Sequence, residues 1–236
     1  MPDLPDLEFD AASFSGVARV FPLPAPSLFP RIVQPLHIFE DRYREMMRDA
    51  LSGDGLIAMA VLKPGWETDY ASRPPLEEVA CLGKIVTHHE LEDGRYNLLL
   101  AGVKRIRLIE EVEPPLSFRR ARVELVTDLE PDLGEPQIAD LADRLAKAFR
   151  GALPHGEPPE PLQQVFDGDT PLGLLADLAA YTLPIDREVK QAALAAADPT
   201  VRAELLIEAL GTSGESQKDR PEGPNAPGFP PPFSVN

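Results

Sequence analysis

The stretch "KIVTHHELEDGRYNLLLAG" (residues 84–102) predicts a β-hairpin and anchors the interpretation of the rest of the chain. Asp93-Gly94 is a two-residue turn signal, because both central positions of a type I′ turn need positive φ. A two-residue turn places Glu92 opposite Arg95, and this register assigns every neighbouring side chain to a face. The face that can be buried then carries Ile85, Thr87, His89, Leu91, Tyr96, Leu98 and Leu100. We therefore expect a sheet that is covered on one side.

Short apolar runs on both sides of this hairpin predict further strands. The runs are residues 16–23, 31–39, 55–62, 103–112 and 119–126. The segment "GLIAMAVL" (55–62) is continuously apolar, as in a buried strand. Prolines around the first two runs suit strand ends and edges. Gly102 lies within the second hairpin strand and predicts a bend or bulge there.

The segment "PLHIFEDRYREMMRDAL" (residues 35–51) predicts an extended apolar stub, an acidic pair and then an amphipathic helix. Its apolar residues recur at helical spacing: Phe39, Tyr43, Met46, Met47, Ala50 and Leu51. Glu40 and Asp41 fall in the first turn, where carboxylates are favoured, and Glu40 can reach Arg44. Adjacent helical residues diverge by about 100°, so the two acids do not converge on one atom as a catalytic pair must. We interpret Glu40 and Asp41 as a helix start.

Residues 134–211 change to helical periodicity. The apolar stripe Ile138, Leu141, Leu145, Ala148 and Phe149 stops at Gly151. Helix starts are expected at Thr170-Pro171, Asp186 and Asp198-Pro199, and a helix end at Gly211. Short helices with brief connections pack as a bundle, so the fold class is α+β: strands around one helix, followed by a helical bundle.

The chain is expected to have four parts. Residues 1–13 are an N-terminal extension, residues 14–128 the β-rich subdomain, residues 129–211 the helical subdomain, and residues 212–236 a tail rich in proline and glycine. The tail cannot bury enough apolar area to offset its ordering entropy, so disorder is expected there.

Composition restricts the classes of function. The 236 residues are 43% hydrophobic and carry a net charge of −16, which disfavours a nucleic-acid ligand. The acidic N-terminus does not resemble a signal peptide, and no apolar run approaches the ~18 residues of a membrane helix. Cys81 stands alone, so we expect a buried thiol and neither a disulfide nor a zinc site. Together these features favour the cytoplasm and argue against a membrane partner.

The sequence also lacks the motifs that catalysis or cofactor binding requires. It contains no phosphate-binding loop, no dinucleotide fingerprint, no nucleophile elbow and no H-E-x-x-H. His88, His89 and Glu90 are consecutive in a predicted strand, so His89 points to the opposite face from its two neighbours and the three side chains do not converge on one metal. His89 is expected to be partly buried and His88 exposed. We therefore expect no catalytic residue, cofactor or metal.

The order of three segments resembles the substrate-binding N-terminal domain of Lon-type proteases, above all its stand-alone bacterial members. The segments are residues 21–47, 82–108 and 190–210, and the resemblance covers nearly all of 14–211. The best-matching residues are Pro35, Leu36, His37, Ile38, Phe39, Glu40, Arg42, Tyr43, Gly83, Asp93, Gly94, Arg95, Tyr96, Gly102 and Arg105. The resemblance implies a small β-barrel-like sheet (PUA-like) wrapping one helix, followed by a C-terminal helical bundle.

The resemblance also implies binding without catalysis. In full-length Lon proteases this domain engages unfolded or tagged polypeptides, whereas separate ATPase and serine–lysine protease domains cut them. We expect a protein-binding module that recognises apolar peptide segments, and an adaptor for a separate ATP-dependent protease or chaperone is one form of it. Trp66 and Tyr70 are candidate anchors for a partner, and an open sheet edge is another candidate surface. A small-molecule sensor binding between sheet and bundle, or a stand-alone hydrolase, are the alternatives.

Overall fold

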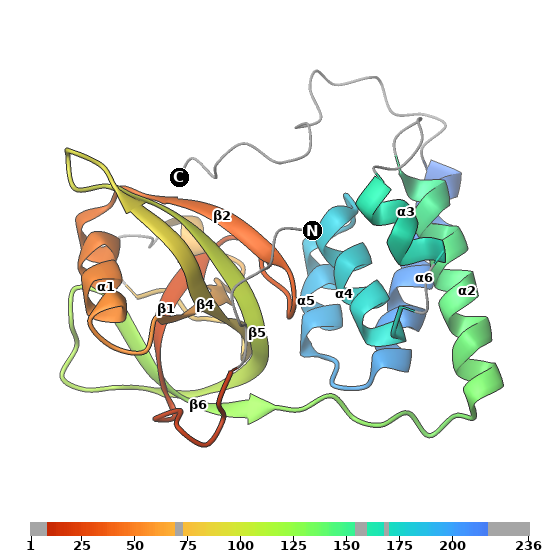
Figure 1. Ribbon diagram of the computed structural model, residues 1–236, viewed down its shortest axis with the longest axis horizontal. Helices are drawn as coiled ribbons and strands as arrows, with labels where there is room; N and C mark the ends of the chain where they lie inside the picture. The colour runs from red at the N-terminus through yellow and green to blue at the C-terminus, as the bar shows by residue number, and fades with distance from the viewer. Residues whose placement is uncertain (1–8, 69–72, 154–159, 168–169, 217–236) are drawn as a thin grey trace. The chain divides into compact units, whose positions relative to one another are not determined.

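The computed structural model describes residues 9–68, 73–153, 160–167 and 170–216 (Figure 1). The chain divides into two compact units, with the described residues up to Val126 in the first and those from Thr127 in the second. The first unit is built of strands with one α-helix, and the second of helices. This arrangement confirms the predicted α+β fold class.

The first unit is a closed sheet. Its strands are β1 (Val17–Leu23), β2 (Val33–Ile38), β3 (Leu56–Val61), β4 (Val79–Glu90), β5 (Tyr96–Glu111) and β6 (Arg119–Val126). The sheet order is β2-β5-β4-β3-β1-β6, and β5 also pairs with β6. The long β5 can do both because its first half pairs with β2 and its second half with β6. Five strands therefore close into a barrel, and β2 remains as an edge strand on β5.

The barrel interior is filled by small and branched apolar side chains. Its core comprises Ala18, Val20, Leu56, Ala58, Ala60, Ala80, Leu82, Ile106, Ala121 and Val123. Alternate residues of each strand face inward, as the two-residue period of a strand requires. Every residue of β3 is buried, as its continuous apolar run predicts. Cys81 is buried in β4 as expected.

The hairpin between β4 and β5 is present, but the predicted register is wrong by one residue. The Leu91 N–H donates to the Arg95 carbonyl (2.8 Å), and the Gly94 N–H donates to the Leu91 carbonyl (2.8 Å). Gly94 has positive φ and Asp93 does not, which makes the loop a type I turn followed by a left-handed glycine rather than a type I′ turn. Glu90, not Leu91, therefore pairs with Tyr96.

This shift moves the β4 side chains to new surroundings. Thr87 and His89 are exposed, so the prediction of a partly buried His89 is wrong. His88 is exposed as expected. On β5, the predicted inward residues Tyr96, Leu98 and Leu100 are buried.

Two glycines of the matching motif are required by close approaches of other parts of the barrel. A Cβ on Gly102 would overlap the carbonyl oxygen of Phe29, because the segment before β2 crosses over this point. That crossing is fixed by hydrogen bonds from the Arg31 N–H to the Gly102 carbonyl (2.7 Å) and from the Gly102 N–H to the Ile32 carbonyl (2.9 Å). A Cβ on Gly83 would lie 2.6 Å from Leu100 Cγ. The bend or bulge predicted at Gly102 is present as a register shift between β4 and β5, next to the pair Gly83–Gly102.

Helix α1 (Asp41–Leu51) is present, and Asp41 lies in its first turn as predicted, but Glu40 is the N-cap residue and Phe39 precedes the helix. Its buried side chains are Tyr43, Met46, Met47 and Ala50. Tyr43 packs edge-on against Phe21 of β1, with ring centroids 4.5 Å apart. Glu40 pairs with Arg42 rather than with Arg44. Arg44 binds Asp41 (2.8 Å) and donates to the Gly94 carbonyl (2.8 Å), and so ties the helix to the hairpin turn.

The second unit consists of α2 (Glu135–Ala152), α3 (Glu160–Asp167), α4 (Leu172–Thr182), α5 (Arg187–Ala195) and α6 (Pro199–Ser216). α6 packs against α2, α4 and α5. Asp186 is the N-cap of α5, and Asp198 Oδ1 accepts the Thr200 N–H (2.8 Å) at the start of α6, as predicted. α3 was not expected, and α6 continues beyond the predicted end at Gly211. Residues 217–236 of the predicted tail lie outside the described residues.

A buried arginine lies at the centre of this helical unit. Arg202 is fully buried and makes two hydrogen bonds to the Asp128 carboxylate, at 3.0 and 2.7 Å. The buried Asp177 lies 3.8 Å from Arg202 Nε. Gly173 leaves room for the guanidinium, since a Cβ there would lie 2.8 Å from Arg202 Nη2. Within the described ranges, no helix is long and apolar enough to cross a membrane.

Candidate functional site

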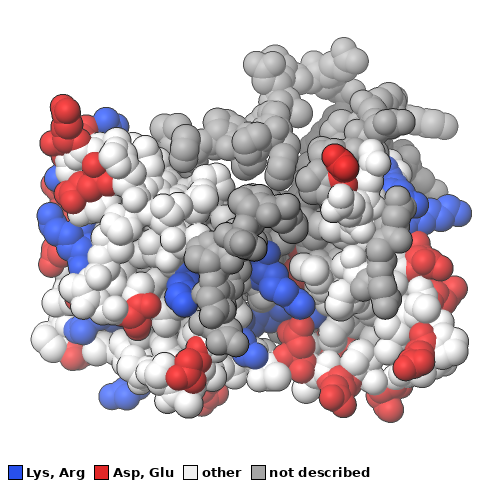
Figure 2. Space-filling view, in the orientation of Figure 1, with Lys and Arg blue, Asp and Glu red and all other residues white. Residues whose placement is uncertain are grey.

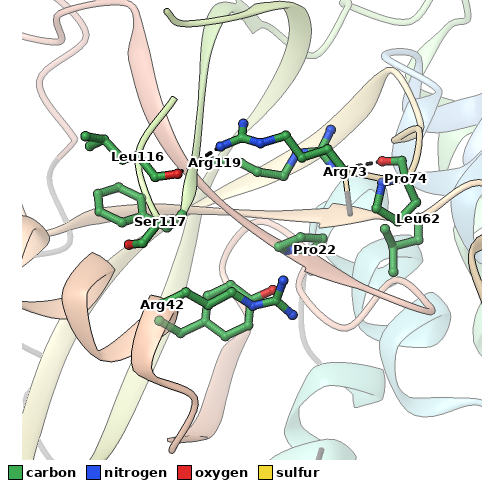
Figure 3. Close-up of a pocket in the computed structure, with 10 residues that line it drawn as sticks. Pro22, Arg42, Leu62, Arg73, Pro74, Leu116, Ser117 and Arg119 are labelled. Carbon is green, nitrogen blue, oxygen red and sulfur yellow. Dashed lines mark hydrogen bonds between the residues drawn. The ribbon is translucent and has the colours of Figure 1, made fainter. Parts of the chain in front are cut away.

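A pocket of about 330 Å³ opens at one end of the barrel (Figure 3). Its walls come from the end of β1, the start of α1, the segments after β3 and before β4, and the start of β6. The lining residues are Pro22, Arg42, Tyr43, Leu62, Arg73, Pro74, Leu116, Ser117, Phe118 and Arg119. β1 and β3 are parallel, so their carboxyl ends reach the same rim and bring Pro22 and Leu62 together. The local strand topology therefore builds this cavity within one unit.

Two arginines on one side of the pocket are cross-braced. Arg73 Nη1 and Arg119 Nη2 bind the two carboxylate oxygens of Glu111, the Arg73 contact being 2.6 Å. Arg73 also donates to the Leu116 carbonyl (2.9 Å), and Arg119 donates to the Pro74 carbonyl (2.7 Å). Arg73 thus binds the segment that leads into Arg119, and Arg119 binds the segment that carries Arg73. Arg119 Nε is buried and has no hydrogen-bond partner among the described residues.

The third arginine lies on the other side of the pocket, in the first turn of α1 (Figure 3). Arg42 donates to Glu40 Oε2 through Nε (2.9 Å) and Nη2 (2.8 Å). Its guanidinium carbon lies 4.6 Å from the centroid of the Tyr43 ring, a cation–π distance. Nearby, Ser117 Oγ donates to Glu45 Oε2 (2.6 Å), which joins α1 to the segment before β6.

The charges around the pocket form two layers. Three of the ten lining residues are arginines, and none of the ten is acidic. The carboxylates of Glu40, Glu45 and Glu111 are bonded to lining residues but do not themselves line the cavity. Elsewhere on the visible face of this unit, basic and acidic side chains are interspersed (Figure 2). The charged groups that face the cavity are therefore guanidinium groups, and their carboxylate partners lie behind them.

A shallow second depression adjoins the first through Tyr43, which lines both. Its other lining residues are Phe21, Leu36, His37, Ile38, Phe39 and Glu40. His37 Nδ1 lies 2.6 Å from Asn97 Oδ1, and the His37 and Phe39 rings are stacked with centroids 6.1 Å apart. Beside it, burial and the facing Glu90 carboxylate raise the pKa of Tyr96. A hydrogen bond from the Arg95 N–H and the Arg95 guanidinium lower the pKa of Asp93.

The residues that carry the family resemblance lie in three different places in the structure. Arg42 and Tyr43 line the pocket, with Glu40 and Phe39 beside them. Asp93, Gly94 and Arg95 form the hairpin turn, and Gly83, Gly102 and the buried Arg105 lie in the barrel wall. The motif is therefore mostly a signature of the fold, and only its first part reaches the cavity.

Of the two predicted partner anchors, Trp66 is half-buried at the start of the short 3₁₀ helix η1 (Trp66–Thr68) and does not line the pocket. Tyr70 lies outside the described residues. Sequence reasoning missed Arg73, Glu111 and Arg119. Arg119 falls in the predicted strand 119–126, but strand alternation predicts only that successive side chains point to opposite faces and not that one of them lines a cavity. In the parts of the chain that the structure describes, no cluster of His, Cys, Asp and Glu is arranged to hold a metal.

Comparisons with known proteins place this architecture. A model of the ATP-dependent protease La (LON) substrate-binding domain matches residues 17–212. Lon protease 2 of Myxococcus xanthus is 27% identical over 203 residues, which are 86% of this chain and 24% of that protein. The Lon protease of Xanthomonas oryzae pv. oryzae is 28% identical over 191 residues, covering 80% of this chain and 22% of that protein. The chain thus spans about a quarter of the length of these relatives.

Solved structures show the same fold. The N-terminal domain of the Mycobacterium avium complex Lon protease superposes with a TM-score of 0.65 at 20% identity, covering 83% of this chain and 98% of that one. A Lon N-terminal domain protein from Xanthomonas campestris gives a TM-score of 0.60 at 20% identity, covering 81% and 97%. Strands and helices therefore follow the same arrangement in all three chains.

Proposed function

Because this chain belongs to the family of the LON substrate-binding domain, we propose that it binds unfolded or tagged polypeptides through the pocket at the end of the barrel. The observation that carries the proposal is the family match over residues 17–212. The pocket supports it, since a cavity with apolar walls and a few polar groups is the usual form of a binding site.

The pocket is a better candidate than the sheet edge. β2 is the edge strand, and a polypeptide could in principle add to it as a further strand. Pro35 lies in the middle of β2 and has no N–H, so the row of backbone donors along this strand is interrupted. Natural edge strands use proline in this way against unwanted pairing.

The proposal assigns binding, and not hydrolysis, to these 236 residues. The matching part of the Lon relatives is their substrate-binding domain. On this proposal the chain hands a polypeptide to a separate ATP-dependent protease or chaperone. We expect the purified chain to leave casein uncut with or without ATP, as measured by gel electrophoresis over hours; cleavage that one substitution abolishes would favour the hydrolase alternative.

Binding can be tested by fluorescence anisotropy with dye-labelled peptides taken from unfolded proteins. We expect saturable binding at micromolar concentrations, and weaker binding by Leu116→Glu, which places a charge on the apolar wall. Leu129→Glu is the matched control, because Leu129 is also an exposed leucine and does not line the pocket. Saturable binding that both variants retain would move the binding site away from the pocket.

A further inference from the structure

The pocket surface has the chemistry of a carboxylate receptor. Arg42, Arg73 and Arg119 line it, and the acidic partners of these arginines do not. A guanidinium presents a planar set of donors that matches the two oxygens of a carboxylate. Glu40 and Glu111 lie outside the lining and offset the positive charge of the arginines. The three guanidinium groups can therefore lie close together and still face the cavity.

The arginine side chains are already immobilised. Arg73 and Arg119 are each bonded both to Glu111 and to a backbone carbonyl. A mobile arginine side chain loses rotamer entropy when it binds a ligand, and this loss weakens binding. Arg73 and Arg119 are already fixed when the protein folds, so ligand binding does not carry this cost. Their bonds hold both guanidinium groups in place before a ligand arrives, so the site is preorganised.

The remaining walls are apolar. Pro22, Leu62, Leu116 and Phe118 line the cavity together with the ring of Tyr43. Its volume of about 330 Å³ is at the small end of the 300–1,000 Å³ typical of ligand pockets. The cavity thus has room for one or two residues. A ligand that fills it carries an apolar group next to its negative charge.

The surroundings of the pocket favour a ligand with a single carboxylate over a ligand with a chain of phosphates. The net charge of −16 repels a polyanion more strongly than a monoanion. The described lining contains no lysine that would add a further point charge for a phosphate.

From these observations we propose that the pocket binds the free C-terminal carboxylate of a polypeptide whose last side chain is apolar. This inference rests on the proposed polypeptide-binding function and specifies its ligand. The carboxylate would contact the arginines, and the terminal side chain would contact Leu116 and Phe118. A small apolar acid offers the same chemistry, and the test below separates the two sources.

The test compares two dye-labelled peptides of one sequence that ends in leucine, one with a free C-terminal carboxylate and one with a C-terminal amide. We expect the free acid to bind at least about tenfold more tightly, since a charge-assisted pair is among the stronger polar contacts. Arg119→Met should abolish this difference. Arg122→Met is the matched control on the same strand, because Arg122 is 65% exposed, pairs with Glu110 and does not line the pocket.

Arg119 also braces the barrel, so a second variant guards against loss of folding. Leu116 is 37% exposed, and Leu116→Glu should reduce binding of the free acid more than binding of the amide, because like charges repel. Equal affinities for acid and amide in the unaltered chain would overturn the carboxylate inference and leave polypeptide binding intact. Failure of both peptides to bind would overturn the proposed function as well.

Competition with N-acetyl-leucine distinguishes a polypeptide C-terminus from a small apolar acid as the ligand. We expect it to displace the free-acid peptide only at concentrations at least about tenfold above the dissociation constant of the peptide, since it lacks the contacts of the preceding residues. Displacement at the concentration of the peptide dissociation constant would overturn the polypeptide source in favour of a small apolar acid.

Discussion

Arg202 of the helical unit and the pair Arg73 and Arg119 of the barrel unit lie in opposite surroundings. In the helical unit, Arg202 is fully buried and bonded to Asp128, next to the buried Asp177. In the barrel unit, Arg73 and Arg119 share Glu111 at the rim of an open pocket. The enclosed arginine satisfies groups of its own unit, whereas the open pair presents donors to a cavity. On our proposal, the solvent access of an arginine cluster, rather than its presence, is what separates the binding role of the Arg73–Arg119 pair from the structural role of Arg202.

The largest expected effect tests the enclosed arginine. Arg202→Met leaves Asp177 buried without the guanidinium 3.8 Å away and removes two hydrogen bonds from Asp128. Loss of one partner of a buried ion pair costs about 3–5 kcal/mol. We expect the free energy of unfolding of the helical unit to fall by this amount in urea titrations followed by circular dichroism.

Arg144→Met is the control for that experiment. Arg144 is 56% exposed and its pair with Asp140 spans 3.8 Å, so its loss should change the free energy of unfolding by less than about 0.5 kcal/mol. Similar values for the two variants would show that Arg202 does not stabilise its unit, and the contrast between the two arginine sites would disappear.

The next effect tests the close backbone packing of the barrel. Gly102→Ala forces a Cβ against the Phe29 carbonyl, which cannot move without breaking the crossing before β2. Overpacking of this kind costs about 1–3 kcal/mol. Gly151→Ala is the control, since nothing lies within 4 Å of its Cβ position and the residue is in α2. Calorimetry should show a lower Tm for the first variant and an unchanged or higher Tm for the second.

A smaller effect is expected for the stability of the open cluster. Arg73 and Glu111 have side chains 37% and 33% exposed, and solvent-screened pairs contribute only about 0–1 kcal/mol. Arg73→Gln should therefore change the urea midpoint little while it weakens binding of the free-acid peptide. A loss of stability as large as that of Arg202→Met would mean that this cluster, too, is structural.

The smallest effect is a pH dependence in the helical unit. Burial lowers the pKa of Lys190 below its usual 10.5. Between the folded value and 10.5 the unfolded chain binds more protons, so the free energy of unfolding rises with pH. Burial raises the pKa of Tyr181 above 10.0, which opposes the trend at higher pH. We expect a rise in urea midpoint that ends near pH 10.

Lys190→Met should flatten that rise, because the methionine has no proton to release. Lys147→Met should preserve it, since Lys147 is exposed on α2. The measurement is the urea midpoint at several values between about pH 7 and 10, where the carboxylates are already ionised. A rise that persists in Lys190→Met would assign the pH dependence to other groups.

Local signals predicted most of the elements. Continuous apolar character identified β3, and helical spacing together with the acidic first turn identified α1. The hairpin was located correctly, but Asp93-Gly94 suits two loop lengths, and local sequence could not choose between them. The choice of the three-residue loop accompanies tertiary contacts, among them the bond from Arg44 to the Gly94 carbonyl. One residue of register then decided that His89 is exposed.

The sequence by itself determined the fold class, because strand and helix periods and capping residues act over a few residues and are visible in the order of side chains. Tertiary structure alone decided the pocket. Arg42, Arg73, Glu111 and Arg119 belong to four separate segments, and they meet because β1 pairs both with β6 and, in parallel, with β3. β5 and β6 are neighbours along the chain, but β1 and β6 are the first and last strands of the unit, and no local pattern records that two such distant strands will pair.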